Sequence, residues 1–134
     1  MNKVVEFLNA NPVQYLATVG RDGKAKCRPF MFTGELDGRL WFCTATTKDV
    51  WEELTRNQRF EATAWWPGHG WLILRGRAGL EDRANPSMRE AGWRHLEGLG
   101  ERYDGPDDPT LTFFSVEEPQ AWICNHDEWQ PVEL

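Results

Sequence analysis

Two short stretches of the chain combine the residue types that bind a phosphate group. One is the run KCRPFMF, which holds Arg28, and the other is FCTATTKDV, which holds Thr44, Thr46, Thr47 and Lys48. The second run leads into a segment with helical periodicity, and a helix N-terminus presents unpaired N–H groups to an anion. Hydroxyl, ammonium and guanidinium groups add further donors. The pattern therefore predicts a site for a terminal phosphate.

A simpler interpretation of the second stretch stands beside this one. Thr46 and Asp49 have the spacing of a capping box, in which a threonine satisfies the first N–H groups of a helix. A capping threonine followed by a lysine stabilises helices that bind nothing. Spacing alone does not choose between the two, and one threonine can cap while its neighbour binds a ligand.

Three β-rich runs separated by Asp-Gly turns predict an antiparallel meander before this helix. The runs are YLATV, AKCRPFMFTGEL and RLWFCT, and the turns are Asp22-Gly23 and Asp37-Gly38. Asp-Gly supplies the positive φ values that tight hairpin turns require. The last run leads directly into the helix, which we expect to begin at about residue 47.

The second Asp-Gly turn lets the two stretches share one site. If it closes a hairpin, Phe32 or Thr33 lies opposite residues 40–42. Arg28 then lies farther along its strand, toward the end at which Lys48 emerges. We therefore expect the guanidinium and the ammonium groups to meet the same anion.

The rest of the chain predicts further strands and two more helices. About six antiparallel strands with short helices between them favour a barrel, because closure removes exposed edges. The expected elements are a helix over 2–10 with Asn2 as its cap and Pro12 after its end, strands in RFEATAWW and WLILRGRAGLE, a helix begun by Asn85-Pro86, and final strands in TLTFFSVEEPQAWICN and EWQPVEL.

Length and charge restrict the class of protein. A chain of 134 residues predicts a single domain over 1–134. The formal net charge of −6 argues against nucleic acid as a partner, although residues 21–28 hold four of the fifteen lysines and arginines. No apolar run approaches membrane-spanning length and the N-terminus lacks a signal-peptide pattern, so we expect a soluble, cytoplasmic protein that does not contact a membrane.

The cysteines and histidines form no recognisable metal site. Cys27, Cys43 and Cys124 have no CxxC spacing and are predicted to be reduced, the first two in the core. Cys124 and His126 lack further ligands nearby, so no metal is expected. The eight tryptophans indicate buried aromatic surface, an interface or a flat ligand.

Three motifs make the chain resemble a known superfamily. They are Arg28-Pro29 on the second predicted strand, Thr44-x-x-Thr47-Lys48 before the helix, and Trp71-(x)4-Gly76-x-Ala78 on the fifth strand. In these the chain is similar to the pyridoxamine 5′-phosphate oxidase-like superfamily of FMN-binding split barrels, most of all to its short, nitroimidazole-resistance (Nim) members. The resemblance implies a mainly β fold, a six-stranded antiparallel split β-barrel with short helices.

The resemblance also implies a cofactor and an assembly. The family forms homodimers with FMN in clefts at the interface. The residues that it places around the cofactor are Arg28, Pro29, Phe30, Met31, Cys43, Thr44, Thr46, Thr47, Lys48 and Trp71. Arg28, Thr47 and Lys48 would hold the phosphate, and Trp71 would neighbour the flavin ring.

The implied activity is transfer of electrons from NAD(P)H through FMN to a small acceptor of the quinone or nitroaromatic type. No catalytic side chain is assigned, because a flavin carries this chemistry itself. True pyridoxamine phosphate oxidases have a longer C-terminal region whose Arg and His hold the substrate. Nothing in the ending HDEWQPVEL provides this region, so that reaction is not expected. A flavin-binding electron carrier or redox sensor without turnover, a haem- or deazaflavin-binding barrel, and a barrel that has lost its ligand remain alternatives.

Overall fold

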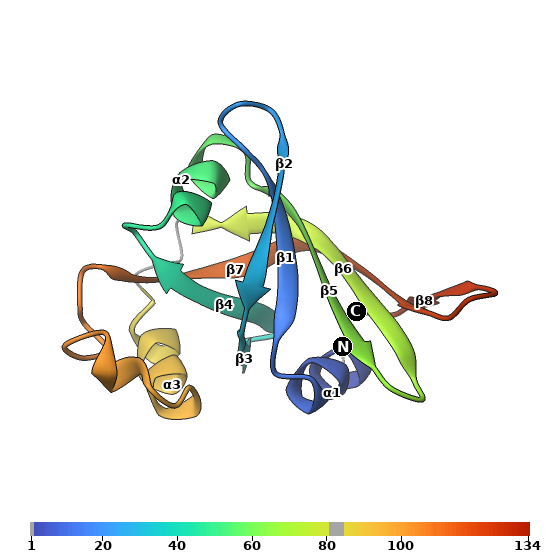
Figure 1. The fold of residues 1–134 in the computed structure, drawn as a ribbon. Helices are drawn as coiled ribbons and strands as arrows, with labels where there is room; N and C mark the ends of the chain where they lie inside the picture. The colour runs from blue at the N-terminus through green and yellow to red at the C-terminus, as the bar shows by residue number, and fades with distance from the viewer. Residues whose placement is uncertain (1, 81–84) are drawn as a thin grey trace.

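The computed structural model describes residues 2–80 and 85–134, which form one strongly curved β-sheet with helices at its ends and over one of its faces (Figure 1). The elements in chain order are α1 (Asn2–Ala10), β1 (Gln14–Val19), β2 (Ala25–Phe30), β3 (Phe32–Leu36), β4 (Arg39–Ala45), α2 (Asp49–Arg56), β5 (Arg59–Trp66), β6 (Gly70–Gly79), α3 (Pro86–His95), the 3-10 helix η2 (Leu99–Glu101), β7 (Leu111–Cys124) and β8 (Trp129–Val132). None of the helices in this part of the chain has the length and apolar character needed to cross a membrane.

The order of the strands explains why the sheet curls. All pairings between the described strands are antiparallel and follow the order β2-β1-β5-β6-β7-β4-β3, with β8 added beside β7. β2 and β3 therefore lie at opposite ends of this order, yet Met31 alone separates them in the chain. The sheet must bend until its two ends meet at Met31, which makes it a split barrel and confirms the expected mainly β fold class.

The described part contains eight strands where six were expected. The predicted strand in AKCRPFMFTGEL is divided at Met31 into β2 and β3, and the C-terminal segment supplies both β7 and β8. The predicted hairpin register is confirmed, because Phe32 pairs with Phe42 across the turn. At that turn Asp37 and Gly38 both have positive φ, at 54° and 73°.

Aromatic side chains fill the interior of the barrel. Phe30, Phe42, Phe60 and Phe114 come from four different strands, and the centroids of the rings in contact lie 5.7 to 6.2 Å apart. Apolar side chains of α1 and α2 join this core from opposite ends of the sheet (Figure 1). Packed rings of this kind hold the curved strands at a fixed separation.

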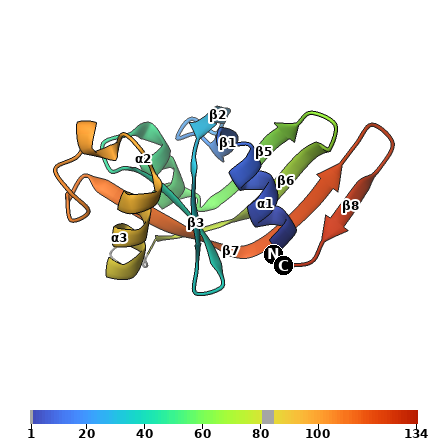
Figure 2. The same ribbon diagram turned by 90° about the horizontal axis from the view of Figure 1, so that it is seen from below.

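A second cluster lies on the other face of β3, β4 and β7, where α3 covers the sheet. Seen from below, β3 lies between α3 and α1 (Figure 2). Asn85 accepts a hydrogen bond from the Met88 amide at 3.0 Å, so the predicted cap and start of this helix are confirmed. Gly92 faces Phe113 so closely that a Cβ atom there would lie 2.5 Å from a ring carbon. The absence of a side chain lets α3 approach the sheet.

We expect Gly92→Ala to lower the free energy of unfolding by about 1–3 kcal/mol, because the added methyl would overlap the buried Phe113 ring. Chemical denaturation monitored by tryptophan fluorescence measures the change. Gly100→Ala is the matched control, since a Cβ at Gly100 would meet only Trp93 at 3.8 Å. Equal effects of the two changes would contradict the packing argument.

Candidate cofactor site

The turn between β4 and α2 carries the predicted phosphate-binding residues. α2 begins at Asp49, and its N-cap is Lys48, whose side chain makes no capping hydrogen bond. The predicted capping box of Thr46 and Asp49 is therefore wrong, and α2 begins two residues after the expected start at about residue 47. The Thr46 amide donates instead to Thr110 O at 2.8 Å and the Lys48 amide donates to Ala45 O at 3.1 Å, so the turn is held by backbone bonds.

This arrangement leaves donors at the start of α2. The first N–H groups of a helix have no partner within it, and those of Asp49 and Val50 are in this position. Thr47 and Lys48 are exposed on the turn. Within the described part of the chain, the Lys48 ammonium group has no ion-pair partner, so it is available to a ligand.

A cavity of about 390 Å³, here called the Cys43 cavity, lies where the two ends of the sheet meet. This volume falls in the range of roughly 300–1,000 Å³ that small-molecule sites occupy. The structure brings six of the ten predicted residues into its lining, namely Pro29, Phe30, Met31, Cys43, Thr44 and Lys48. Their convergence depends on the closure of the sheet at Met31.

The chemistry of this lining suits a ligand with both apolar and polar parts. Thr44 is buried and its hydroxyl oxygen has no hydrogen-bond partner among the described residues, which leaves a donor and acceptor for a bound group. Burial raises the pKa of the Cys43 thiol, and the Thr33 hydroxyl and the Lys48 charge only partly oppose this. The pKa of Tyr103 is raised too, first by burial. Both side chains are therefore neutral at neutral pH.

The opposite wall of the Cys43 cavity consists of residues that the sequence did not single out. Val13 and the segment 96–103, which includes η2, supply it. Arg102 and Tyr103 bring a cation and an aromatic ring from this segment. The sequence showed here only a helix end followed by a loop, and loop residues carry no periodicity that would reveal what they face.

Arg28 lies in a neighbouring cavity of about 580 Å³, here called the Arg28 cavity. Its guanidinium donates to Glu53 Oε1 at 2.6 Å, to Thr18 Oγ1 at 2.8 Å and to Leu16 O at 3.2 Å. Lys48 lines this cavity as well as the Cys43 cavity, so it stands at the boundary between them. Arg28 and Lys48 are thus brought to one region, as expected, but Arg28 already has protein partners.

The sequence did not identify Glu53 and Thr18 as partners of Arg28, although the position of Glu53 in α2 indicates a buried carboxylate. In α2, Val50 and Leu54 mark the buried face, and Glu53 lies on that face three residues after the first. A carboxylate among buried positions indicates a partner elsewhere in the fold. The identity of that partner depends on the pairing of distant strands, which the sequence does not show.

The remaining predicted residues lie outside the two cavities. Thr46 and Thr47 precede Lys48 on the turn but are in neither lining. Trp71 pairs with Trp65 and with Cys124 near the β5–β6 turn, on the side of the sheet away from α2 and α3 (Figure 1). Trp71 is therefore not brought to the Cys43 cavity within one chain.

Cys27, which was predicted to be buried, is exposed in the lining of the Arg28 cavity. The prediction was wrong because β2 is an edge of the strand order, and the side chain of Cys27 faces away from the barrel interior. Cys43 is partly buried and Cys124 buried, and all three are free thiols. Across the described ranges, no group of three or more His, Cys, Asp or Glu side chains is placed to hold a metal ion.

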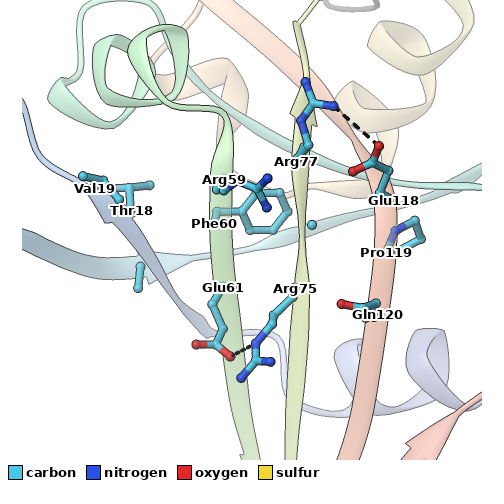
Figure 3. A pocket seen from close by; sticks show the side chains of 12 residues that line it. Thr18, Val19, Arg59, Phe60, Glu61, Arg75, Arg77, Glu118, Pro119 and Gln120 are labelled. Atoms are coloured by element: carbon cyan, nitrogen blue, oxygen red, sulfur yellow. Dashed lines mark hydrogen bonds and ion pairs between the residues drawn. The ribbon is translucent and has the colours of Figure 1, made fainter.

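A third and larger cavity, of about 680 Å³, opens on the outer face of β1, β5, β6 and β7 (Figure 3). Ion pairs cross it, with Arg75 Nε 2.7 Å from Glu61 and an Arg77 nitrogen 3.6 Å from Glu118. None of the ten predicted residues lines it. The candidate cofactor site is therefore the Cys43 cavity, although it is smaller.

The sequence and the fold both match known proteins. A model of the family described as pyridoxamine 5′-phosphate oxidase matches residues 1–122. Among solved structures, a NimC/NimA family protein from Clostridium acetobutylicum is 25% identical, with a TM-score of 0.85 and coverage of 98% of this chain and 93% of that one.

Two further solved structures share the fold at lower identity. A pyridoxamine 5′-phosphate oxidase-related, FMN-binding protein from Nostoc punctiforme is 14% identical, with a TM-score of 0.63 and coverage of 99% of this chain and 96% of that one. A heme-binding protein from Mycobacterium smegmatis is also 14% identical, with a TM-score of 0.72 and coverage of 96% and 55%. No curated protein matches the chain.

The thiols test the geometry of the two cavities. We expect iodoacetamide to alkylate Cys27 first, because it is exposed, and Cys43 slowly, because its raised pKa keeps it as a thiol at neutral pH. Raising the pH from about 7 to about 9 should accelerate the Cys43 reaction as thiolate forms. Mass spectrometry of digested protein measures both rates, and Cys27→Ser identifies the fast phase. Faster labelling of Cys43 than of Cys27 would refute this placement.

Proposed function

This chain belongs to the pyridoxamine 5′-phosphate oxidase family, and on that premise we propose that it binds FMN in the Cys43 cavity. The observation that carries the proposal is the convergence of six residues from β2, the link after it, β4 and the turn before α2 around one cavity. This cavity contains an unpaired Lys48 ammonium group and an unpaired Thr44 hydroxyl. The FMN-binding relative from Nostoc punctiforme shares the fold and adds support.

Different residues of the site would contact different parts of the cofactor. Lys48, the Thr47 hydroxyl and the free N–H groups at the start of α2 would hold the phosphate, because they are the donors exposed at the turn. The backbone of Pro29 to Met31 and of Cys43 to Thr44 would line the flavin ring. Since Cys43 and Tyr103 are neutral, they place no charge against that ring.

The proposed activity is that of an oxidoreductase. A bound FMN supplies two-electron redox chemistry, in which NAD(P)H is oxidised and a quinone or nitroaromatic acceptor is reduced. This chain would orient the ring and limit the access of water to it. The wall formed by residues 96–103 would serve the second purpose. The C-terminal residues 125–134 bring no arginine, so the family's vitamin B6 reaction is not proposed.

We also propose a homodimer with FMN at the interface. Residues directly opposite each other in paired strands share a face, and so Tyr15, Trp65, Trp71 and Trp122 all lie on the outer face of the sheet. Trp65 is 70% exposed and Tyr15 51%. Large exposed aromatic side chains on one face are typical of an interface. A second copy on this face is what could bring Trp71 to a flavin.

The test of cofactor binding is titration of the purified protein with FMN, followed by flavin fluorescence quenching. We expect a flavin absorption spectrum on binding and release of FMN on denaturation. Lys48→Ala should weaken FMN binding roughly 10- to 100-fold, which is the loss of one charge-assisted hydrogen bond. Lys24→Ala is the matched control, because Lys24 is exposed and lines none of the cavities described.

A protein that neither contains nor takes up FMN would overturn the proposal, and equal effects of the two lysine changes would remove Lys48 from the phosphate site. Anaerobic mixing with NADH or NADPH then separates the classes of function. Bleaching of the bound flavin at a rate that supports turnover indicates an oxidoreductase, whereas an unreduced flavin indicates a sensor or a carrier with another donor.

Haem is the second candidate ligand, because the heme-binding protein from Mycobacterium smegmatis shares the fold. Among the described residues, the lining of the Cys43 cavity contains no histidine. The raised pKa values of Cys43 and Tyr103 disfavour the thiolate and the phenolate that would bind iron. The chemistry of the lining therefore favours FMN over haem. A Soret band after incubation with hemin, with no uptake of FMN, would reverse this preference.

The interface is tested separately. We expect Trp65→Glu to raise the dimer dissociation constant by roughly 30-fold or more, because it replaces a large exposed aromatic side chain of this face with a charge. Sedimentation equilibrium measures this constant. Ala91→Glu, which adds the same charge to the exposed side of α3, should leave it unchanged. A wild-type protein that sediments as a monomer would show that the face is not an interface between copies.

A further inference from the structure

A largely buried ion pair joins α2 to the β1–β2 hairpin beside the proposed phosphate site. The Glu53 side chain is 5% exposed and that of Arg28 is 23% exposed. Glu53 Oε1 accepts hydrogen bonds from Arg28 at 2.6 Å and from Thr18 at 2.8 Å. We propose that Glu53 is a positioning residue: by holding Arg28 and Thr18 it fixes the start of α2 on the hairpin and so sets where Lys48 meets a ligand phosphate.

The proposal rests on the proposed FMN site and adds an indirect role to the phosphate contact that family resemblance implies for Arg28. Its guanidinium donates to three protein groups: Glu53, the Thr18 hydroxyl and the Leu16 carbonyl. A guanidinium has five N–H donors, so these bonds leave donors with which Arg28 can also face a phosphate. Loss of the Glu53 charge would therefore disturb both Arg28 and the start of α2.

Stability alone does not account for a pair of this kind. Apolar residues of similar volume often serve a fold as well as a buried ion pair does, whereas the pair has strict geometric requirements. Here the geometry links three elements, because Thr18 is on β1, Arg28 on β2 and Glu53 on α2. Fixing their relative positions is useful where a short turn must present donors accurately.

The position of Lys48 shows what the link controls. Lys48 lies five residues before Glu53, at the N-cap of the helix that Glu53 anchors. The Arg28 cavity, which contains the ion pair, and the Cys43 cavity meet at Lys48. A small rotation of α2 would move the ammonium group and the first N–H groups together, whereas residues 29–31 and 43–44, which are outside α2, would stay in place.

A second, exposed link at the same end of α2 provides a control. Arg21 lies 2.9 Å from Glu52 and 3.5 Å from Asp49, with side chains that are 46% exposed or more. Exposed pairs contribute little and leave a solvated group when broken. Glu52 and Glu53 are adjacent glutamates on one helix, so the same substitution at each separates buried from exposed anchoring.

The experiment compares the affinities of the protein for FMN and for riboflavin, which lacks the phosphate. Glu53→Gln keeps the size of the side chain and removes its charge, and we expect it to weaken FMN binding about 10-fold while changing riboflavin binding less than about twofold. Glu52→Gln should change neither affinity. Fluorescence quenching measures both affinities, and thermal unfolding of each apoprotein reports stability separately.

Thr18→Val is a milder change that removes only the hydroxyl hydrogen bonds, so it decides the matter if Glu53→Gln does not fold. A smaller loss of FMN affinity, again with riboflavin spared, supports the proposal. Unchanged or tighter FMN binding in these variants would overturn it, because the position of the phosphate donors would then not depend on Glu53. Equal losses for FMN and riboflavin would overturn it too, by showing a purely structural role. Failure of the wild-type protein to bind FMN refutes the proposed function itself and is seen before any variant is made.

Discussion

The whole arrangement depends on one constraint, the closure of the sheet at Met31. β2 and β3 are at opposite ends of the strand order but are adjacent in the chain. The chain can satisfy both conditions only if the sheet bends through most of a barrel, and the packed phenylalanine rings in its interior support that curvature. Closure brings residues 29–31 against the end of β4, where Cys43 and Thr44 lie, and so creates the Cys43 cavity.

The charges of this protein are unevenly distributed, so the net charge does not describe the candidate site. The chain has a net charge of −6, yet Lys48 and Arg28 stand within or beside the candidate cofactor site. The two cations differ in an important way. Arg28 is paired with a buried carboxylate, whereas Lys48 has no ion-pair partner among the described residues. From residue type alone, both cations are expected to bind the phosphate in the same way.

The fold class was predictable because its signals are local. Asp37-Gly38 specifies a hairpin turn, alternating side chains specify strands, and Asn85-Pro86 specifies the start of a helix. The start of α2 was not predictable, because a capping threonine and a backbone-held turn have the same spacing in the sequence. Only the bond from the Thr46 amide to the distant Thr110 carbonyl decided between them.

By itself the sequence indicated a mainly β barrel, since side-chain alternation and turn residues are local signals. Together with the family resemblance it named six of the residues that line the candidate cavity. Tertiary structure decided the rest. It placed Trp71 on the outer face, brought residues 96–103 to the cavity as one wall, and paired Arg28 with Glu53. These outcomes depend on which distant strands become neighbours, and such pairing follows from the packing of the whole sheet rather than from any local pattern.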